Sequence, residues 1–139
     1  MISIENKNEW IYQGRYIDTL EDCYGFVYCI TNMLTRRKYI GRKYLTRIAY
    51  KTVNAKRKKI RKESDWKDYY GSSEELKKDI ELLGKENFMR EILHLCKTRG
   101  ICNYMELKEI IVQKALESDE YYNSWISARI HKSHLKNLE

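Results

Sequence analysis

The chain has 139 residues, of which 42% are hydrophobic and 34% charged, and it carries a net charge of +7. This length predicts one domain over residues 1–139, and the lack of a long apolar run excludes a membrane-spanning helix. The N-terminus has no charged and then apolar layout, so we expect no export signal, no membrane partner and a cytoplasmic location. In that setting the four cysteines are expected to be reduced thiols.

Residues 1–22 form a lead-in segment of mixed composition. Trp10, Tyr12 and Tyr16 give it aromatic side chains that suit either an extra strand or an arm packed on the domain. The pattern does not decide between these two forms.

A β-hairpin is predicted directly after the lead-in. Apolar and polar residues alternate from Tyr24 to Ile30, a second β-prone run spans Lys38 to Lys43, and the polar residues 31–37 between them suit a turn. The hairpin places Tyr28 and Tyr39 on neighbouring strands.

These two tyrosines are candidates for phosphate chemistry. Gly41 lies close behind Tyr39, where a backbone can approach a ligand closely. A tyrosine has a pKa of about 10, so its use as a base requires nearby positive charge, which we expect from the cations that follow. These cations are Arg42, Lys43 and Arg47. The alternative is that Tyr28 and Tyr39 are ordinary cross-strand packing partners.

The positive charge is concentrated in one segment. Arg36 to Lys62 contains thirteen Lys or Arg and no Asp or Glu, which leaves 14 basic and 20 acidic residues elsewhere. Weak helical spacing predicts a short helix after Tyr44, followed by a basic mobile loop over residues 51–65. Tyrosines interleaved with the cations favour nucleic acid over a merely solvated loop. The candidate DNA contacts here are Arg42, Lys43, Arg57, Lys58, Lys59 and Arg61.

A helix is predicted after Ser72-Ser73. Ser72 suits the N-cap, Glu75 suits the reciprocal position of a capping box, and Gly84 suits the end of the helix. The unpaired N–H groups at such a helix start also make Ser72 and Ser73 secondary candidates for contacts with DNA phosphate.

The remaining chain predicts a third strand over 87–96, a helix from Asn103 to near Ser118 and a short helix over 121–130. Residues 132–139 are expected to be a frayed tail. The resulting fold class is α+β, with a small three-stranded antiparallel sheet flanked by helices.

Two short motifs give this chain a family resemblance. Phe26-Val27-Tyr28 and Tyr39-Ile40-Gly41 resemble the paired signature of the GIY-YIG endonuclease family, although the first glycine is displaced to Gly25. The runs WKDYYGSS (66–73) and DEYYN (119–123) resemble phage-type, homing endonuclease-like members. The likeness covers about residues 24–130, and the fold that it implies agrees with the predicted one.

The resemblance implies a metal-dependent endonuclease that hydrolyses phosphodiester bonds in double-stranded DNA, with Mg²⁺ or another divalent cation such as Mn²⁺ as cofactor. It also implies that Tyr28 acts on the attacking water, that Tyr39 helps to position it, and that the products carry a 3′-hydroxyl and a 5′-phosphate. A phage-encoded homing enzyme in the cytoplasm of an infected cell is the natural extension. The sequence leaves open whether the protein forms a homodimer.

The family also uses an arginine that grips the scissile phosphate. Its usual offset from the motif glycine falls on Ala49. Arg47 is therefore the first choice, Arg42 the reserve, and Arg57 or Arg61 the further alternatives. Each has the charged, forked guanidinium that this role needs.

Glu106 resembles the metal-binding glutamate of the family. Its spacing from Asn103 also suits a capping box, and Glu109 competes for the same catalytic role. Asn123 resembles the terminal asparagine that supports the site by hydrogen bonds, with a turn or helix cap as the alternative.

Two other functions remain open at this stage. The displaced arginine and the altered first motif suit a non-catalytic module that binds nucleic acid. A restriction or repair nuclease on the same fold fits the sequence as well.

Overall fold

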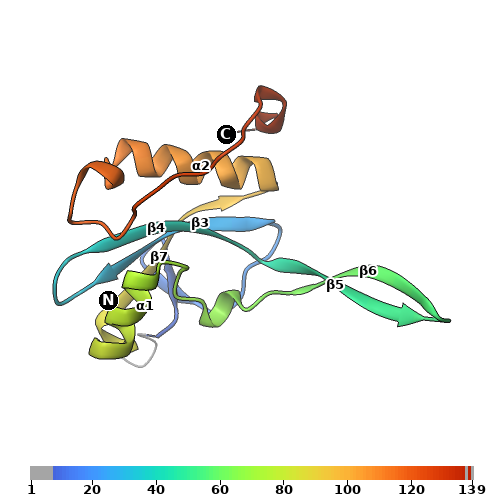
Figure 1. The fold of residues 1–139 in the computed structure, drawn as a ribbon, viewed down its shortest axis with the longest axis horizontal. Helices are drawn as coiled ribbons and strands as arrows, with labels where there is room; N and C mark the ends of the chain where they lie inside the picture. The colour runs from blue at the N-terminus through green and yellow to red at the C-terminus, as the bar shows by residue number, and fades with distance from the viewer. Residues whose placement is uncertain (1–7, 137, 139) are drawn as a thin grey trace.

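The computed structural model describes residues 8–136 and 138, which form an α+β fold (Figure 1). A five-stranded mixed sheet has the order β2-β1-β7-β3-β4, and β5 and β6 form a separate two-stranded sheet. In this described part no helix is both long enough and apolar enough to cross a bilayer. The elements are β1 (Trp10–Tyr12), β2 (Arg15–Ile17), β3 (Gly25–Asn32), β4 (Lys38–Tyr44), β5 (Thr46–Val53), β6 (Lys56–Glu63), α1 (Glu74–Leu83), β7 (Phe88–Cys96) and α2 (Arg99–Val112).

The predicted hairpin forms the middle of the large sheet. β3 pairs antiparallel with β4, so that Tyr28 lies opposite Gly41, and β7 pairs antiparallel with the other side of β3. Every residue of β3 is buried because α2 covers one face of the sheet, while α1 and the loop before it cover the other (Figure 1). β4 is left as an edge strand.

The prediction of a three-stranded sheet was wrong because the lead-in segment adds two strands. β1 pairs parallel with β7, and β2 pairs antiparallel with β1. Trp10 anchors this addition: it is buried against Phe26 and Tyr28, and its indole N–H donates to the carbonyl of Trp66 at 2.7 Å. Of the two forms that the sequence left open for the lead-in, the structure has the extra strand, which is stabilised by burial of the Trp10 ring. Residues 1–7 of the lead-in lie outside the described residues.

The short helix and the loop predicted after Tyr44 were also wrong. β5 and β6 form an antiparallel hairpin that projects from the body of the protein (Figure 1). Asn54 and Ala55 connect the strands with φ angles of 52° and 62°, which is the two-residue turn that matches the twist of a hairpin. Residues with high β propensity, such as Ile48 and Tyr50, alternate along β5 and support the strand.

Helix α1 begins one residue later than predicted. Ser73 rather than Ser72 is the N-cap, and its hydroxyl accepts a hydrogen bond from the Leu76 N–H at 3.2 Å. Glu75 does not bond back to the cap but pairs with Arg37 at 2.7 Å. The first turn of α1 is therefore tied to the segment that precedes β4.

Helix α2 begins at Arg99 and not at Asn103. Thr98 caps it by accepting a hydrogen bond from the Ile101 N–H at 3.1 Å. Because Asn103 and Glu106 both lie inside the helix, the capping-box explanation for Glu106 is wrong.

The chain after α2 returns to the edge of the sheet. Residues 122–131 have no regular secondary structure, so the short helix predicted over 121–130 was wrong, and Tyr121 forms a β-bridge with Lys38 of β4. The described part of the predicted frayed tail includes a 3₁₀ turn, Lys132–Leu135, which packs against the start of α2. Residues 137 and 139 lie outside the described residues.

Candidate active site

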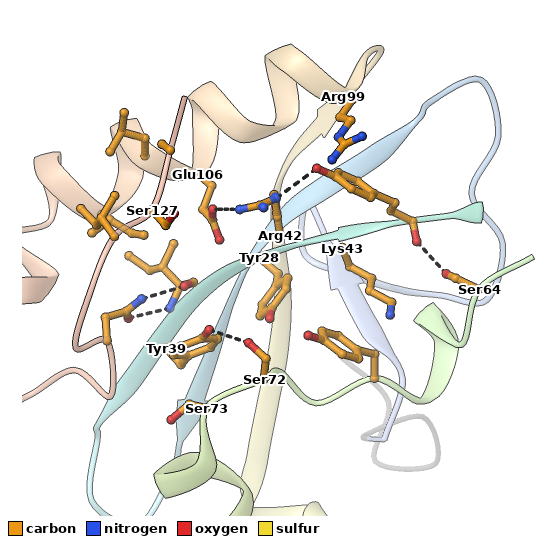
Figure 2. A pocket seen from close by; sticks show the side chains of 18 of the residues that line it. Tyr28, Tyr39, Arg42, Lys43, Ser64, Ser72, Ser73, Arg99, Glu106 and Ser127 are labelled. Atoms are coloured by element: carbon orange, nitrogen blue, oxygen red, sulfur yellow. Dashed lines mark hydrogen bonds and ion pairs between the residues drawn. The ribbon is translucent and has the colours of Figure 1, made fainter. Parts of the chain in front are cut away.

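A cavity of about 970 Å³ lies at the edge of the sheet formed by β4. Successive side chains of a strand point to opposite faces, so Arg42 and Lys43 project on either side of β4. Figure 2 shows Arg42 with Glu106 on one side of this strand, and Lys43 with Tyr28 and Tyr39 on the other. The edge position lets groups from both faces of the sheet reach one cavity.

Tyr28 is inserted into the wall of this cavity. Its side chain is buried, and a Cβ atom at Gly41 would lie only 2.3 Å from its hydroxyl oxygen. Gly41 is therefore the residue that makes room for the phenol. Burial raises the pKa of Tyr28 well above its usual value, and nearby Tyr69 and Tyr39 raise it further. Tyr28 is a protonated phenol at neutral pH.

Tyr39 lies beside Tyr28, with 6.2 Å between the two ring centroids. Its hydroxyl forms a hydrogen bond of 3.1 Å with the hydroxyl of Ser72, so Ser72 orients it. Burial raises the pKa of Tyr39, and the opposing effects of Ser72 and Arg42 do not cancel this rise. Arg42 lowers the pKa of Tyr39, as expected of a neighbouring cation, but burial outweighs this effect, and the pKa of each tyrosine lies above its usual value.

The effect of the cations on those pKa values is limited because Lys43 and Arg42 have acidic partners of their own. Lys43 pairs with Asp65 at 2.6 Å, and its ammonium lies 4.0 Å from the centroid of the Tyr69 ring. The hydrogen bond from Lys43 lowers the pKa of Asp65. Positive charge that is neutralised in this way has little effect on a phenol nearby.

Arg42 and Glu106 form the second ion pair of the cavity. The Nη1 of Arg42 donates to the Oε1 of Glu106, and its Nε donates to the Tyr44 hydroxyl at 3.2 Å. Tyr44 in turn donates to the Oδ1 of Asn103 at 2.6 Å. Burial raises the pKa of Glu106, although Arg42 offsets part of this effect. The network fixes both charged groups in the wall (Figure 2).

The candidate arginines occupy different positions. Arg42 lies in the wall, whereas Arg47 is exposed on β5 and lines the mouth of the cavity. Arg61 also lines the mouth, where it donates to the Thr46 hydroxyl at 2.9 Å. Arg57 lies further out on the hairpin, as do Lys58 and Lys59, and none of these three lines the cavity.

Asn123 holds the edge of β4. Its side-chain oxygen accepts a hydrogen bond from the Ile40 N–H at 3.0 Å, and its side-chain nitrogen donates to the Ile40 carbonyl at 2.8 Å. The amide thus pairs with the strand as a neighbouring backbone would. It is neither a helix cap nor a turn former.

Glu109 lies outside the cavity. Its carboxylate forms hydrogen bonds with His94 at 2.6 Å and with Gln113 at 3.0 Å, and despite partial burial these bonds lower its pKa. Glu106 is therefore the glutamate that faces the tyrosine pair. Ser72 and Ser73 both line the cavity, although Ser73 is occupied as the helix cap.

Sequence reasoning gave no role to several residues of this cavity. Tyr69 lies between Lys43 and Tyr28, and Arg99 lies 5.8 Å from the centroid of the Tyr44 ring. Tyr69 falls within the quoted WKDYYGSS motif, which is the one signal that pointed toward it. For Arg99 no spacing in the sequence gave a comparable signal.

The site suits a single divalent ion better than a pair. Within residues 8–136 and 138, no three His, Cys, Asp or Glu side chains form a metal-binding group. Glu106 uses one oxygen for Arg42, and Figure 2 shows the other directed toward the tyrosine side of the cavity. Mg²⁺ binds proteins through one or two carboxylates and keeps other positions for water and phosphate oxygen. The donor set therefore fits such an ion.

Comparison with known families agrees with this fold. The family model described as "Putative endonuclease segE, GIY-YIG domain" matches residues 10–126, which is most of the chain. This match defines a nuclease-type domain, and the chain belongs to the GIY-YIG endonuclease family.

The similarity extends to a phage protein. The chain is 35% identical over 101 residues to "Putative endonuclease segE" of Enterobacteria phage T4. This alignment covers 72% of the chain but 40% of the phage protein, so the chain spans well under half of that relative. No solved structure matches the chain.

Proposed function

We propose that this protein is a divalent-metal-dependent endonuclease that hydrolyses phosphodiester bonds in double-stranded DNA. The observation that carries this proposal is the meeting of Tyr28 and Tyr39 with the Arg42–Glu106 pair in one cavity at the edge of β4. Family membership and the phage relative support it. The concentrated positive charge supports DNA as the substrate.

The two phenols act on the nucleophile. Tyr28 first loses its phenolic proton to solvent, and the phenolate then accepts a proton from the attacking water as the new phosphorus–oxygen bond forms. The bond from phosphorus to the leaving 3′ oxygen breaks, and that oxygen takes up a proton from solvent. Tyr39, fixed by Ser72, helps to position that water. The raised pKa values make this proton transfer the demanding part of the reaction.

The other face of the edge strand acts on the phosphate. Arg42 still has donors beyond those used for Glu106 and Tyr44, and its planar guanidinium suits a phosphate. Arg47, at the mouth, is placed for an adjacent phosphate, and Asn123 keeps β4 in position. Glu106 would hold Mg²⁺ or Mn²⁺, which would neutralise charge on the scissile phosphate and the leaving oxygen.

We also propose a homing-type role in the cytoplasm of phage-infected cells, because the motifs and the T4 relative are of phage type. Cleavage sites mapped on phage and host genomes test this role. A single long site in phage DNA supports a homing enzyme. Frequent short sites or lesion-dependent cutting would instead indicate a restriction or repair enzyme.

Nicking of supercoiled plasmid tests the central proposal. The wild-type protein is expected to nick in Mg²⁺ and to be inactive in EDTA. Tyr28→Phe removes only the hydroxyl oxygen and is expected to reduce the nicking rate at least about a hundredfold, the scale of general base catalysis. Binding of a fluorescent DNA duplex should change little.

Tyr104→Phe is the matched control, since Tyr104 lies on α2 outside the cavity. It removes an equivalent hydroxyl and is expected to leave the rate unchanged. If the wild-type protein binds DNA but never nicks it under any metal condition, the protein is a non-catalytic binder.

The rate of cleavage is expected to rise with pH. Because the pKa of Tyr28 lies well above its usual value, phenolate is scarce at neutral pH and increases about tenfold per pH unit. Single-turnover nicking should follow this increase, with no plateau below about pH 8.5. A rate that is flat above pH 7 would show that Tyr28 does not act as the base.

A further inference from the structure

The β5–β6 hairpin (residues 46–63) forms a basic arm. It projects from the body of the protein (Figure 1), and its side chains divide between two faces. One face holds five cations and no acidic residue, while the other holds three cations and Glu63. The five cations of the first face are Arg47, Lys51, Lys56, Lys58 and Lys62.

The arrangement of these cations is unfavourable for the hairpin itself. Arg47 lies directly opposite Lys62, and Lys51 directly opposite Lys58. Like charges in such cross-strand pairs destabilise a two-stranded sheet, which has little stability to spare. Folding therefore does not explain these cations, but binding of a polyanion does.

The two faces also differ in how their cations are held. On the three-cation face Arg57 stacks on Tyr50 at 3.9 Å, and Arg61 donates to Thr46. On the other face the four lysines are exposed and have no ion pair or side-chain hydrogen bond within the described part of the chain. Their ammonium groups are available to an external ligand.

The shape of the arm selects among polyanions. A two-stranded ribbon fits the major groove of B-form DNA, which is about 12 Å wide. A ribbon in a groove has phosphates on both sides, and the arm has cations on both faces. Against the outside of a duplex, one face would meet solvent and its charge would contribute little.

The position of the arm relates it to the cavity. Thr46, Arg47 and Arg61, at the base of the arm, line the mouth of the cavity. Eight residues of β5 at about 3.3 Å each give a reach of about 26 Å, or roughly eight base pairs. We infer that the basic arm lies in the major groove of the DNA duplex and holds about eight base pairs to one side of the cleaved phosphodiester.

This inference rests on the proposed action on DNA, but its test measures binding only. The probe is a fluorescein-labelled 30-base-pair duplex, titrated with the full chain in EDTA at 50–200 mM NaCl, with anisotropy as the readout. The arm variant combines Lys51→Gln, Lys56→Gln, Lys58→Gln and Lys62→Gln. It is expected to bind at least about tenfold more weakly, and its log–log salt slope should fall by about three.

A matched control removes the same net charge elsewhere. Lys77→Gln, Lys78→Gln, Lys108→Gln and Lys114→Gln are four exposed positions on or just after the two helices. This control is expected to bind within about threefold of wild type. Equal losses in the two variants would show that only net charge matters and would overturn the inference.

The groove is tested with modified duplexes. Bulky groups on pyrimidine C5 project into the major groove. They are expected to weaken DNA binding by the wild-type protein but not by the arm variant. Double-stranded RNA has a deep, narrow major groove, so the two proteins should bind it alike. If a minor-groove ligand competes instead, or if the arm variant loses RNA binding equally, the major-groove placement is wrong.

Folding does not confound this test. The substitutions relieve like-charge pairs, so the arm variant is expected to melt at or above the wild-type temperature. A wild-type protein that fails to nick but shows the arm-dependent binding would disprove the nuclease function and leave this inference intact. A wild-type protein that nicks DNA but whose binding does not depend on the arm would support the nuclease function and overturn this inference.

Discussion

Replacing Glu106 with glutamine is expected to reduce plasmid nicking at least about a hundredfold while leaving the affinity for DNA nearly unchanged. The substitution keeps the size of the side chain and removes the negative charge that a divalent ion requires. Glu106 is the carboxylate that faces the tyrosine pair, and its partner Arg42 remains in place. The measurement is the single-turnover nicking rate over a range of Mg²⁺ and Mn²⁺ concentrations.

Glu109→Gln supplies the matched control for this prediction. Glu109 lies on the same helix but bonds to His94 and Gln113 outside the cavity. It is expected to retain at least about a third of the wild-type rate. If Glu109→Gln were the inactive variant and Glu106→Gln were active, the assignment of the metal ligand would be wrong.

The substitution Arg90→Leu is expected to destabilise the protein by about 3 kcal/mol or more. Arg90 is a buried guanidinium on β7 that forms no ion pair among residues 8–136 and 138, and it is held by backbone carbonyl groups instead. It donates to Lys67 at 2.9 Å and to Tyr69 at 2.8 Å, and also to Asn8. Leucine would leave all three partly buried hydrogen bonds without their donor.

Urea unfolding followed by circular dichroism measures this effect, with exposed Arg129→Leu as the control. Because Arg90 anchors the loop that carries Tyr69, a fraction of the activity should be lost even where the variant is folded. A change in unfolding free energy below about 1 kcal/mol would show that water replaces the guanidinium without much cost.

The tyrosine pair was predictable because local alternation specifies a hairpin, and a hairpin fixes which side chains are neighbours. Tyr28 and Gly41 are cross-strand partners, as the two motifs imply. Glu106 was predictable as a helical residue but not as a partner of Arg42, since that contact joins positions 64 residues apart. No local rule gives the distance between a helix and an edge strand. For the same reason, the sequence could not decide between Arg42 and Arg47 as the arginine that binds the phosphate.

The basic arm was missed for two physical reasons. Its turn, Asn54-Ala55, has alanine at a position of positive φ where glycine would have signalled a hairpin. Leu45, Ile48, Ala49 and Val53 also have helical spacing by coincidence, whereas the β5 strand places Ile48 and Tyr50, two residues of high β propensity, on one face. A ribbon without a core gives little hydrophobic signal of either kind.

The clamp of Asn123 on Ile40 has a consequence for the integrity of the whole sheet. Strand β4 is an edge strand of the five-stranded sheet, and the free edge of such a strand can pair with a strand of a second molecule. The returning C-terminal segment occupies part of that edge through Asn123 and the bridge at Tyr121. Removing this segment by truncation would therefore expose the free edge of β4 to strand pairing with a second molecule. Such self-association would compete with substrate for the cavity at that edge.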